Sequence, residues 1–160
     1  MEKIILGIDP GIADTGYGCI KVNGASLECL EYGSIKTPAG QELPLRLQTL
    51  FHELQRLLKK HQPQAVIVEE LFFNKNVRTA LIVGQARGVA LLAISEAGVP
   101  LFEYTPGQIK QAVSTYGQAT KKQVQKMVMM ILHLKEIPKP DDAADALAAA
   151  ICGANFRCLK

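Results

Sequence analysis

Acidic residues occur at three places in this sequence where their spacing could support chemistry. Asp9 ends the apolar run "KIILGID", and Glu69 stands near the end of a second apolar run, "AVIVEE". Asp142 and Asp145 are three residues apart in "DDAADALAAAI", a spacing that puts both carboxylates on one face of a helix. Ligands of open α/β sheets bind in the crevice outside the carboxyl ends of the strands, and we expect the four acids to meet there.

Four carboxylates in one half-buried crevice need compensating positive charge. Like charges at close range raise one another's pKa, and bound divalent cations remove that penalty. Oxygen ligands favour Mg²⁺ or Mn²⁺ over Zn²⁺. The cysteines lack the spacing of a zinc site or a disulfide framework and are expected to be small buried hydrophobes: Cys19, Cys29, Cys152 and Cys158.

Each acidic motif also has an ordinary structural explanation. Asp9 precedes a Pro-Gly pair and could simply form a turn, and Glu69 could mark a strand end that meets solvent. The acids near residue 142 could cap a helix and complement its dipole, which explains Asp141 well. The same explanation suits Asp145 poorly, because a buried acid in an Ala-rich helix is costly. Dismissing the cluster needs three independent coincidences, so we favour a shared site.

Length and composition favour one globular domain over residues 1–160. The chain is 48% hydrophobic and 21% charged, and 160 residues are enough to bury a sizeable core. We see no apolar stretch near 18 residues and no signal-peptide pattern in "MEKIILGIDPG", so we expect a cytoplasmic protein that makes no membrane contact. The net charge of +3 is only a weak hint of a polyanionic partner.

The elements that must position the acids alternate in type along the chain. Five runs have the length and composition of strands: residues 3–9, 15–22, 25–37, 65–70 and 100–104. Asn23-Gly24 predicts a hairpin between the second and third strands. Five segments have helical patterns: residues 47–58, 77–97, 108–115, 121–134 and about 142–156. This order predicts an α/β fold with a five-stranded mixed sheet, antiparallel at first and parallel later, flanked by helices.

Glycines and lysines add two further predictions. Gly11, Gly16 and Gly18 follow the first strand, where the lack of side chains would let other backbone approach closely. Glu136 is the only acid in a stretch that holds six lysines, and this stretch could be a phosphate-facing surface or a solvated helix face. The six are Lys110, Lys121, Lys122, Lys126, Lys135 and Lys139.

Four segments together closely resemble the RuvC family of Holliday junction resolvases. They are "ILGIDPGIADTGYG", "VIVEELFFNKN", "GQARGVAL" and "PDDAADALAAAI", and they extend in this order from the first predicted strand to the last helix. The resemblance covers essentially the whole chain, and the combination is highly specific. It implies a ribonuclease H-like fold.

The resemblance also implies roles for individual residues. Asp9 matches the family's first catalytic aspartate, Glu69 its glutamate, and Asp142 and Asp145 its final acidic pair, and all four would be catalytic and metal ligands. Some members carry histidine at the position of Asp142. Glu70 stands where many relatives carry glutamine and could also touch metal.

DNA contacts are implied on both sides of this acidic set. Phe72 and Phe73 match aromatic residues of which one is thought to stack on a base at the opened crossover, while the other could be a hydrophobic plug. Lys110 and Lys121 match basic residues near the scissile phosphate. The remaining expected DNA-binding residues are Lys75, Arg78 and Lys122.

The implied reaction is resolution of four-way DNA junctions in homologous recombination and DNA repair. Two Mg²⁺ ions per subunit, replaceable by Mn²⁺, would assist phosphodiester hydrolysis, with Asp9 bridging both. Paired symmetric nicks in strands of like polarity would leave 5′ phosphate and 3′ hydroxyl ends.

Symmetric cutting implies a homodimer. In the family, the helix that matches residues 77–97 helps to form the interface, although ordinary packing on the sheet could also explain its composition. It carries small and apolar residues that permit close helix approach: Leu81, Gly84, Ala86, Gly88, Val89 and Leu92. The family also cooperates with the RuvA–RuvB branch-migration complex.

Three other functions compete with this interpretation. One is another ribonuclease H-like nuclease that acts on RNA, which the "FFNKN" and "GQARG" segments disfavour. Another is a nucleotide-binding module, because "GIDPGIADTGYG" also resembles the phosphate loop of actin-like ATPases, although that fold needs two such domains. The third is a junction-binding protein without catalysis, for which clustered negative charge facing phosphate would be of little use.

Overall fold

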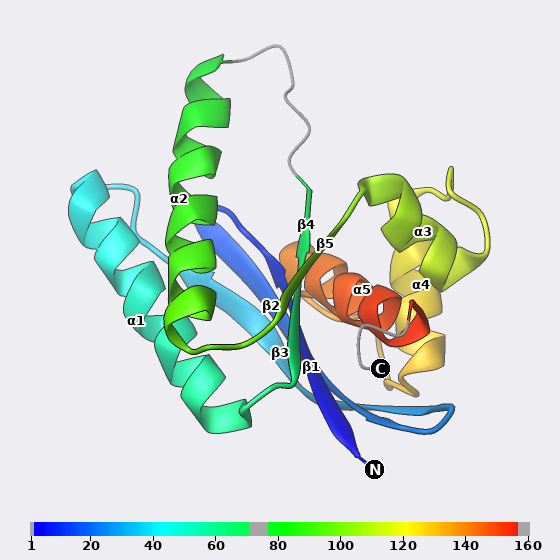
Figure 1. The fold of residues 1–160 in the computed structure, drawn as a ribbon. Helices are drawn as coiled ribbons and strands as arrows, with labels where there is room; N and C mark the ends of the chain where they lie inside the picture. Colours follow the sequence, from blue (N-terminus) through cyan, green and yellow to red (C-terminus); the bar gives the residue numbers. More distant parts are fainter. Residues whose placement is uncertain (1, 71–76, 157–160) are drawn as a thin grey trace.

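A computed structural model describes residues 2–70 and 77–156, and its centre is one five-stranded mixed sheet (Figure 1). The strands lie in the order β3-β2-β1-β4-β5. β1, β2 and β3 are antiparallel neighbours, and β4 and β5 continue the sheet parallel to β1, as predicted. Their bounds are β1 Lys3–Asp9, β2 Asp14–Asn23, β3 Ser26–Lys36, β4 Ala65–Glu69 and β5 Leu101–Tyr104.

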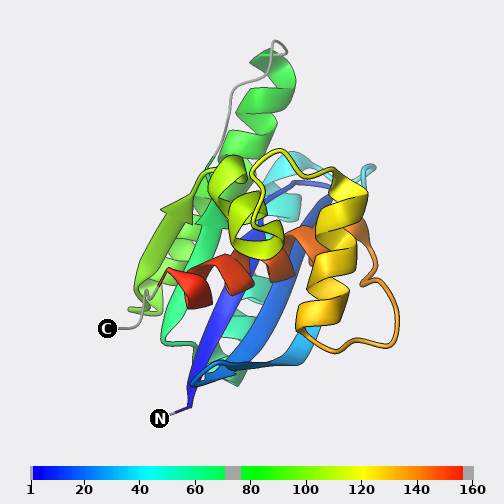
Figure 2. The same ribbon diagram turned by 90° about the vertical axis from the view of Figure 1, so that its right-hand side faces the viewer.

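Helices cover both faces of the sheet, as the two perpendicular views show (Figures 1 and 2). α1 (Leu43–His61) and α2 (Val77–Glu96) lie together on one face. The other face carries α3 (Pro106–Ser114), α4 (Lys121–Ile131) and α5 (Asp141–Asn155). α4 is shorter than predicted, since His133 just beyond it adopts a left-handed backbone with φ of 52° that a helix cannot continue through.

The sheet separates two hydrophobic cores. Because successive residues of a strand point to opposite faces, Ile5 of β1 packs toward α5 while its neighbour Leu6 packs toward α1 and α2. Ile67 and Val66 of β4 divide in the same way. The central strands are therefore buried on both sides, which makes them a rigid base for side chains at their ends.

Three glycines let α5 lie directly against β1 and β2. A Cβ at Gly7 would lie less than 3.0 Å from the carbonyl oxygen of Ala146, and one at Gly16 would lie equally close to that of Asp142. A Cβ at Gly18 would lie 2.7 Å from a side chain of the same helix. The predicted close approach of backbone at Gly16 and Gly18 is thus confirmed, with α5 as the approaching element. The close approach of nucleic acid at these glycines, which the family resemblance implies, stays a prediction.

α2 differs from the sequence-based expectation in one respect. We expected no long apolar stretch, yet residues 79–96 are long and apolar enough to cross a membrane by length and composition alone. We missed the stretch because Arg87 and Glu96 interrupt it, although the average hydropathy stays high. Ala86, Ala90 and Ala93 of this helix pack into the core against the sheet, while most of the stretch is not buried.

Candidate metal centre

Three of the four predicted acids form a tight group at the carboxyl end of β1. Asp9 is the last residue of that strand, and Asp142 and Asp145 lie in the first two turns of α5. One carboxylate oxygen from each lies within 4.8 Å of those of the other two. The close contact of α5 with Gly16 holds this end of the helix against the sheet, so the sequence prediction that these acids meet is confirmed.

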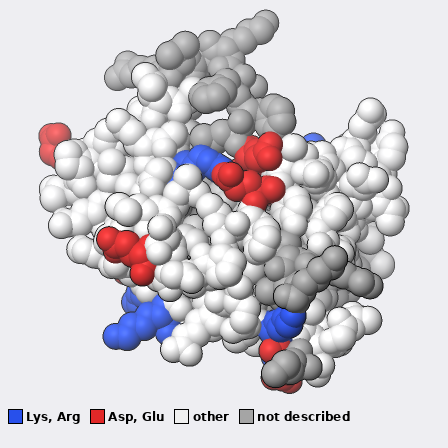
Figure 3. All heavy atoms as spheres, viewed as in Figure 1, with Lys and Arg blue, Asp and Glu red and all other residues white. Residues whose placement is uncertain are grey.

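Glu69 stands beside this group at the end of the neighbouring strand, β4. It does not belong to the set of oxygens within 4.8 Å, but its charge acts on Asp9, and the charge of Asp145 acts on it. The surface around the end of β4 shows acidic side chains gathered next to a basic one (Figure 3). The four acids therefore share one edge of the sheet, three in close contact and one adjacent.

The group cannot stay fully ionised without positive charge. Burial, together with the charges of Asp145, Glu69 and Asp142, raises the pKa of Asp9 to about 8. Burial also raises the pKa values of Asp145 and Glu69. Half-buried carboxylate oxygens that repel one another are suitable ligands for hard divalent cations. Such cations would replace the protons that these acids otherwise retain.

Two of the predicted basic residues lie next to the acids. Lys121 Nζ is 3.2 Å from Asp145 Oδ2 and 3.4 Å from Asp141 Oδ2. Burial lowers the pKa of Lys121, but the charge of Asp145 and the hydrogen bonds to both aspartates outweigh this and raise it overall. Lys110 of α3 lowers the pKa of Glu69 by its charge. Both ammonium groups are thus placed to face a phosphate that approaches the acids.

The other predicted DNA contacts are less defined. Lys122 is exposed in the first turn of α4. Arg78 falls in the first turn of α2, but its side chain lies outside the described residues, as do Phe72, Phe73 and Lys75.

The competing capping role of Asp141 is wrong. The N-cap of α5 is Pro140, and the Asp141 side chain instead accepts a 3.0 Å hydrogen bond from Gln125 Nε2. A proline before the first helical residue cannot supply a side-chain cap, and Asp141 and Asp142 lie in the first turn, where their charges complement the helix dipole as the same explanation expected. Glu70 is exposed, and its backbone nitrogen donates to the Tyr104 oxygen at 2.8 Å.

Sequence reasoning missed Arg87 of α2. Its Nη1 donates to the backbone oxygen of Glu69 at 2.5 Å, and its Nη2 forms an ion pair with Glu103 of β5. The available signal was an arginine in the middle of a largely apolar helix, where a buried charge is costly unless it is paired.

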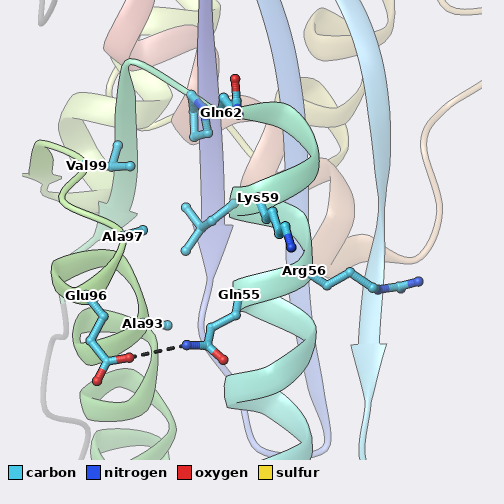
Figure 4. A pocket seen from close by; sticks show the side chains of 10 residues that line it. Gln55, Arg56, Lys59, Gln62, Ala93, Glu96, Ala97 and Val99 are labelled. Atoms are coloured by element: carbon cyan, nitrogen blue, oxygen red, sulfur yellow. Dashed lines mark hydrogen bonds between the residues drawn. The ribbon is translucent and has the colours of Figure 1, made fainter.

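A cavity of about 810 Å³ lies elsewhere, between α1 and α2 (Figure 4). Gln55 and Glu96 reach toward each other across it and form a 3.2 Å hydrogen bond, and Arg56 and Lys59 line its α1 side. None of the four acids lines this cavity, so it is separate from the metal centre.

Comparisons with known proteins identify relatives over nearly the whole chain. The family model described as crossover junction endodeoxyribonuclease RuvC matches residues 5–153. The protein of that name from Brevibacillus brevis is 58% identical over 153 residues, which cover 96% of this chain and 92% of the relative. The one from Heliobacterium modesticaldum is 58% identical over 95% of this chain and 94% of its own.

Solved structures agree with these relatives. The structure described as Thermus thermophilus RuvC in complex with Holliday junction substrate is similar at a TM-score of 0.92. It is 39% identical and covers 96% of this chain and 94% of its own. The yeast mitochondrial resolvase Ydc2, at 15% identity and a TM-score of 0.69, shares the fold over 96% of this chain and 78% of its own.

Proposed function

The chain belongs to the RuvC family of crossover junction endodeoxyribonucleases, and on that premise we propose that Asp9, Glu69, Asp142 and Asp145 hold the cations with which it cuts four-way DNA. It is a Holliday junction resolvase with a ribonuclease H-like fold and depends on divalent metal. The observation that supports this ligand set most directly is the group of three carboxylates within 4.8 Å at the end of β1.

Each acid has a distinct part in the proposed site. Asp9 lies at the end of a strand buried on both faces and is the central ligand between the neighbouring acids. Asp142 and Asp145 enter from α5, and Glu69 enters from β4. These residues would hold two Mg²⁺ ions, or Mn²⁺ in their place, which would supply activation of water and stabilisation of the leaving 3′ oxygen. The products are a 5′ phosphate and a 3′ hydroxyl.

The proposed substrate path crosses the basic side chains beside the acids. Lys121 and Lys110 offset the negative charge of the site and attract the scissile phosphate. The Thermus thermophilus relative is described in complex with a Holliday junction substrate, which supports the same substrate for this chain. The expected contacts of Phe72, Phe73, Lys75, Arg78 and Lys122 with DNA are part of this proposal.

The proposal includes a two-fold dimer through the exposed face of α2. Leu81 and Leu92 are 65% and 53% exposed on this helix, and Gly88 between them has open space around its Cβ position. Ala86 and Val89 pack inward, so only part of the expected interface set is free for a partner. A second copy would cover the apolar stripe and place two acidic sites for symmetric cuts.

Leu92→Glu is expected to weaken this dimer. A carboxylate buried in an apolar interface is costly, so the dissociation constant should rise by about 10-fold or more, measured by sedimentation equilibrium. Met130→Glu on α4, which lies on the opposite face of the sheet and is 61% exposed, is the matched control and should leave the dimer intact. Equal behaviour of the two variants would place the interface elsewhere.

One further partner complex and a location complete the proposal. The RuvA–RuvB branch-migration complex would deliver the junction, and the enzyme would work in the cytoplasm, where bacterial chromosomes are.

The decisive experiment offers the purified protein a mobile synthetic four-way junction and a linear duplex, each with Mg²⁺ or with EDTA. We expect paired symmetric nicks in the junction alone, and their loss in EDTA. If the protein binds junctions of several sequences but cuts none of them in Mg²⁺ or in Mn²⁺, it is a non-catalytic junction-binding protein. Preferential cutting of an RNA–DNA hybrid would instead favour another ribonuclease H-like activity, and an absence of both binding and cutting would favour nucleotide binding.

A further inference from the structure

Arg87 is unusual among the described residues, because it is the only buried side chain there that carries a formal charge. Its side chain is 11% exposed, and burial lowers the pKa of the guanidinium while the charges of Glu70 and Glu69 raise it. A buried guanidinium is retained only when its donors are paired, so the partners of Arg87 indicate what it is for.

Those partners lie on two adjacent strands at the edge that carries the metal centre. Nη1 donates to the backbone oxygen of Glu69, the last residue of β4, and Nη2 pairs with Glu103 of β5. Glu103 is the register partner of Val68, one residue before Glu69. The planar fork of arginine suits this bridge, whereas the single ammonium of lysine cannot span both acceptors.

The backbone of Glu69 is paired on one side only, where Tyr104 of β5 is its register partner. The pairing of β4 with β1 ends at Ile8 and Val68, so β1 does not fix Glu69 on the side where the acids lie. Glu69 is also the acid that stands outside the close group formed by the other three. Arg87 therefore adds, at the Glu69 carbonyl, a contact that the β1 ladder does not supply.

We infer that Arg87 is a positioning residue that fixes the backbone of Glu69 and so sets the metal affinity of the site. The inference rests on the proposed role of Glu69 as a ligand. Arg87 does not touch metal or DNA in this role. It acts through the carbonyl of Glu69, in the way that outer hydrogen bonds orient the ligands of other metal sites.

The test compares Arg87→Lys with Arg56→Lys, a control on α1 whose side chain is 73% exposed and pairs with Glu53. Mn²⁺ binding to the DNA-free protein is measured by electron paramagnetic resonance, and junction cutting is measured across Mn²⁺ concentrations. For Arg87→Lys we expect Mn²⁺ affinity to fall and cutting at low Mn²⁺ to slow by about 10 to 100-fold, with recovery at high Mn²⁺. Junction binding in Ca²⁺ should not change.

A double-mutant cycle with Glu69→Gln separates positioning from general stabilisation. If Arg87 acts through Glu69, Arg87→Lys should lower Mn²⁺ affinity no further once the Glu69 carboxylate has been removed. Unchanged Mn²⁺ affinity in Arg87→Lys, even with a lower melting temperature, would show a structural role alone and overturn the inference. If Glu69→Gln itself binds Mn²⁺ and cuts like the wild type, the proposed ligand set fails instead.

Glu103→Gln keeps the experiment decisive if Arg87→Lys does not fold. It weakens the β5 anchor of the guanidinium and leaves the bond to Glu69 possible. A rise in the Mn²⁺ concentration for half-maximal cutting, with a matching loss of Mn²⁺ affinity, supports positioning. Wild-type values for both measurements overturn it.

Discussion

Asp9→Asn is expected to abolish junction cutting and, at the same time, to stabilise the metal-free protein at pH 8. The amide removes the proposed central ligand, so cutting should fall by more than ~100-fold, beyond the effect typical of outer hydrogen bonds to a ligand. It also removes a buried charge that burial and three neighbouring acids disfavour. One substitution thus separates function from stability.

The gain in stability should depend on pH in one direction. The pKa of Asp9 is about 8 in the folded protein and 3.8 in the absence of its surroundings. Below pH 3.8, Asp9 is protonated in both the folded and the unfolded protein, so its ionisation does not lower the stability of the wild type. As the pH rises toward 8, the unfolded state ionises first, so the wild type loses stability on the order of 5 kcal/mol before screening by water and salt reduces this figure.

Thermal unfolding in EDTA at several pH values measures this difference. The Asn variant should melt above the wild type near pH 8, and the two should converge near pH 4. Mg²⁺ should raise the melting temperature of the wild type more than that of the variant. Asp141→Asn is the matched control, since Asp141 is 64% exposed on the same helix and lies outside the close group. If Asp9→Asn melts at the same temperature as the wild type at every pH, burial and the neighbouring acids do not raise the pKa of Asp9.

Gly16→Ala should damage both the fold and the site. The added methyl group would overlap the backbone of Asp142, so α5 must move away from β2. Overpacking against backbone costs about 3 kcal/mol or more of the free energy of unfolding. A displacement near 1 Å of a catalytic group can slow a reaction by roughly 100-fold, so cutting should fall together with stability.

Urea unfolding measures the stability loss as a lower midpoint with an unchanged slope. Gly40→Ala is the matched control, because nothing lies within 4 Å of its Cβ position, and its stability should stay within about 0.5 kcal/mol of the wild type. If Gly16→Ala unfolded at the wild-type midpoint, the helix would not pack on this strand as closely as the structure has it.

Much of the acidic site could be predicted because its signals are local. A carboxylate at the end of an apolar strand, as at Asp9, and a three-residue spacing on a helix, as at Asp142 and Asp145, each locate a side chain within its own element. The order of the elements then predicts which ends share an edge of the sheet. The mixed sheet, with its antiparallel first strands, and the packing of α5 on that sheet followed from the same reasoning, whereas the full strand order is a finding of the structure.

The rest depends on contacts between elements far apart in the sequence. No local pattern reveals that Arg87 of α2 reaches the carbonyl of Glu69, or that Glu69 stands outside the close group. The packing of α5 on Gly16 could not be predicted from the sequence either, since a glycine after a strand is also typical of a turn. The early end of α4 depends on the left-handed backbone conformation of His133. Few residues other than glycine adopt this conformation, so the sequence does not indicate it.

The order in which the acids occur along the chain also has a consequence during translation. The ribosome makes β1 first and α5 last among the described elements. A nascent chain that already carries Asp9 and Glu69 lacks both acids of α5 until that helix is made. Until then, the strands also lack the helix that packs on their glycines. A product shortened by a premature stop codon before residue 141 would lack Asp142 and Asp145, two of the four proposed ligands, and we expect such a polypeptide to be unable to cut DNA.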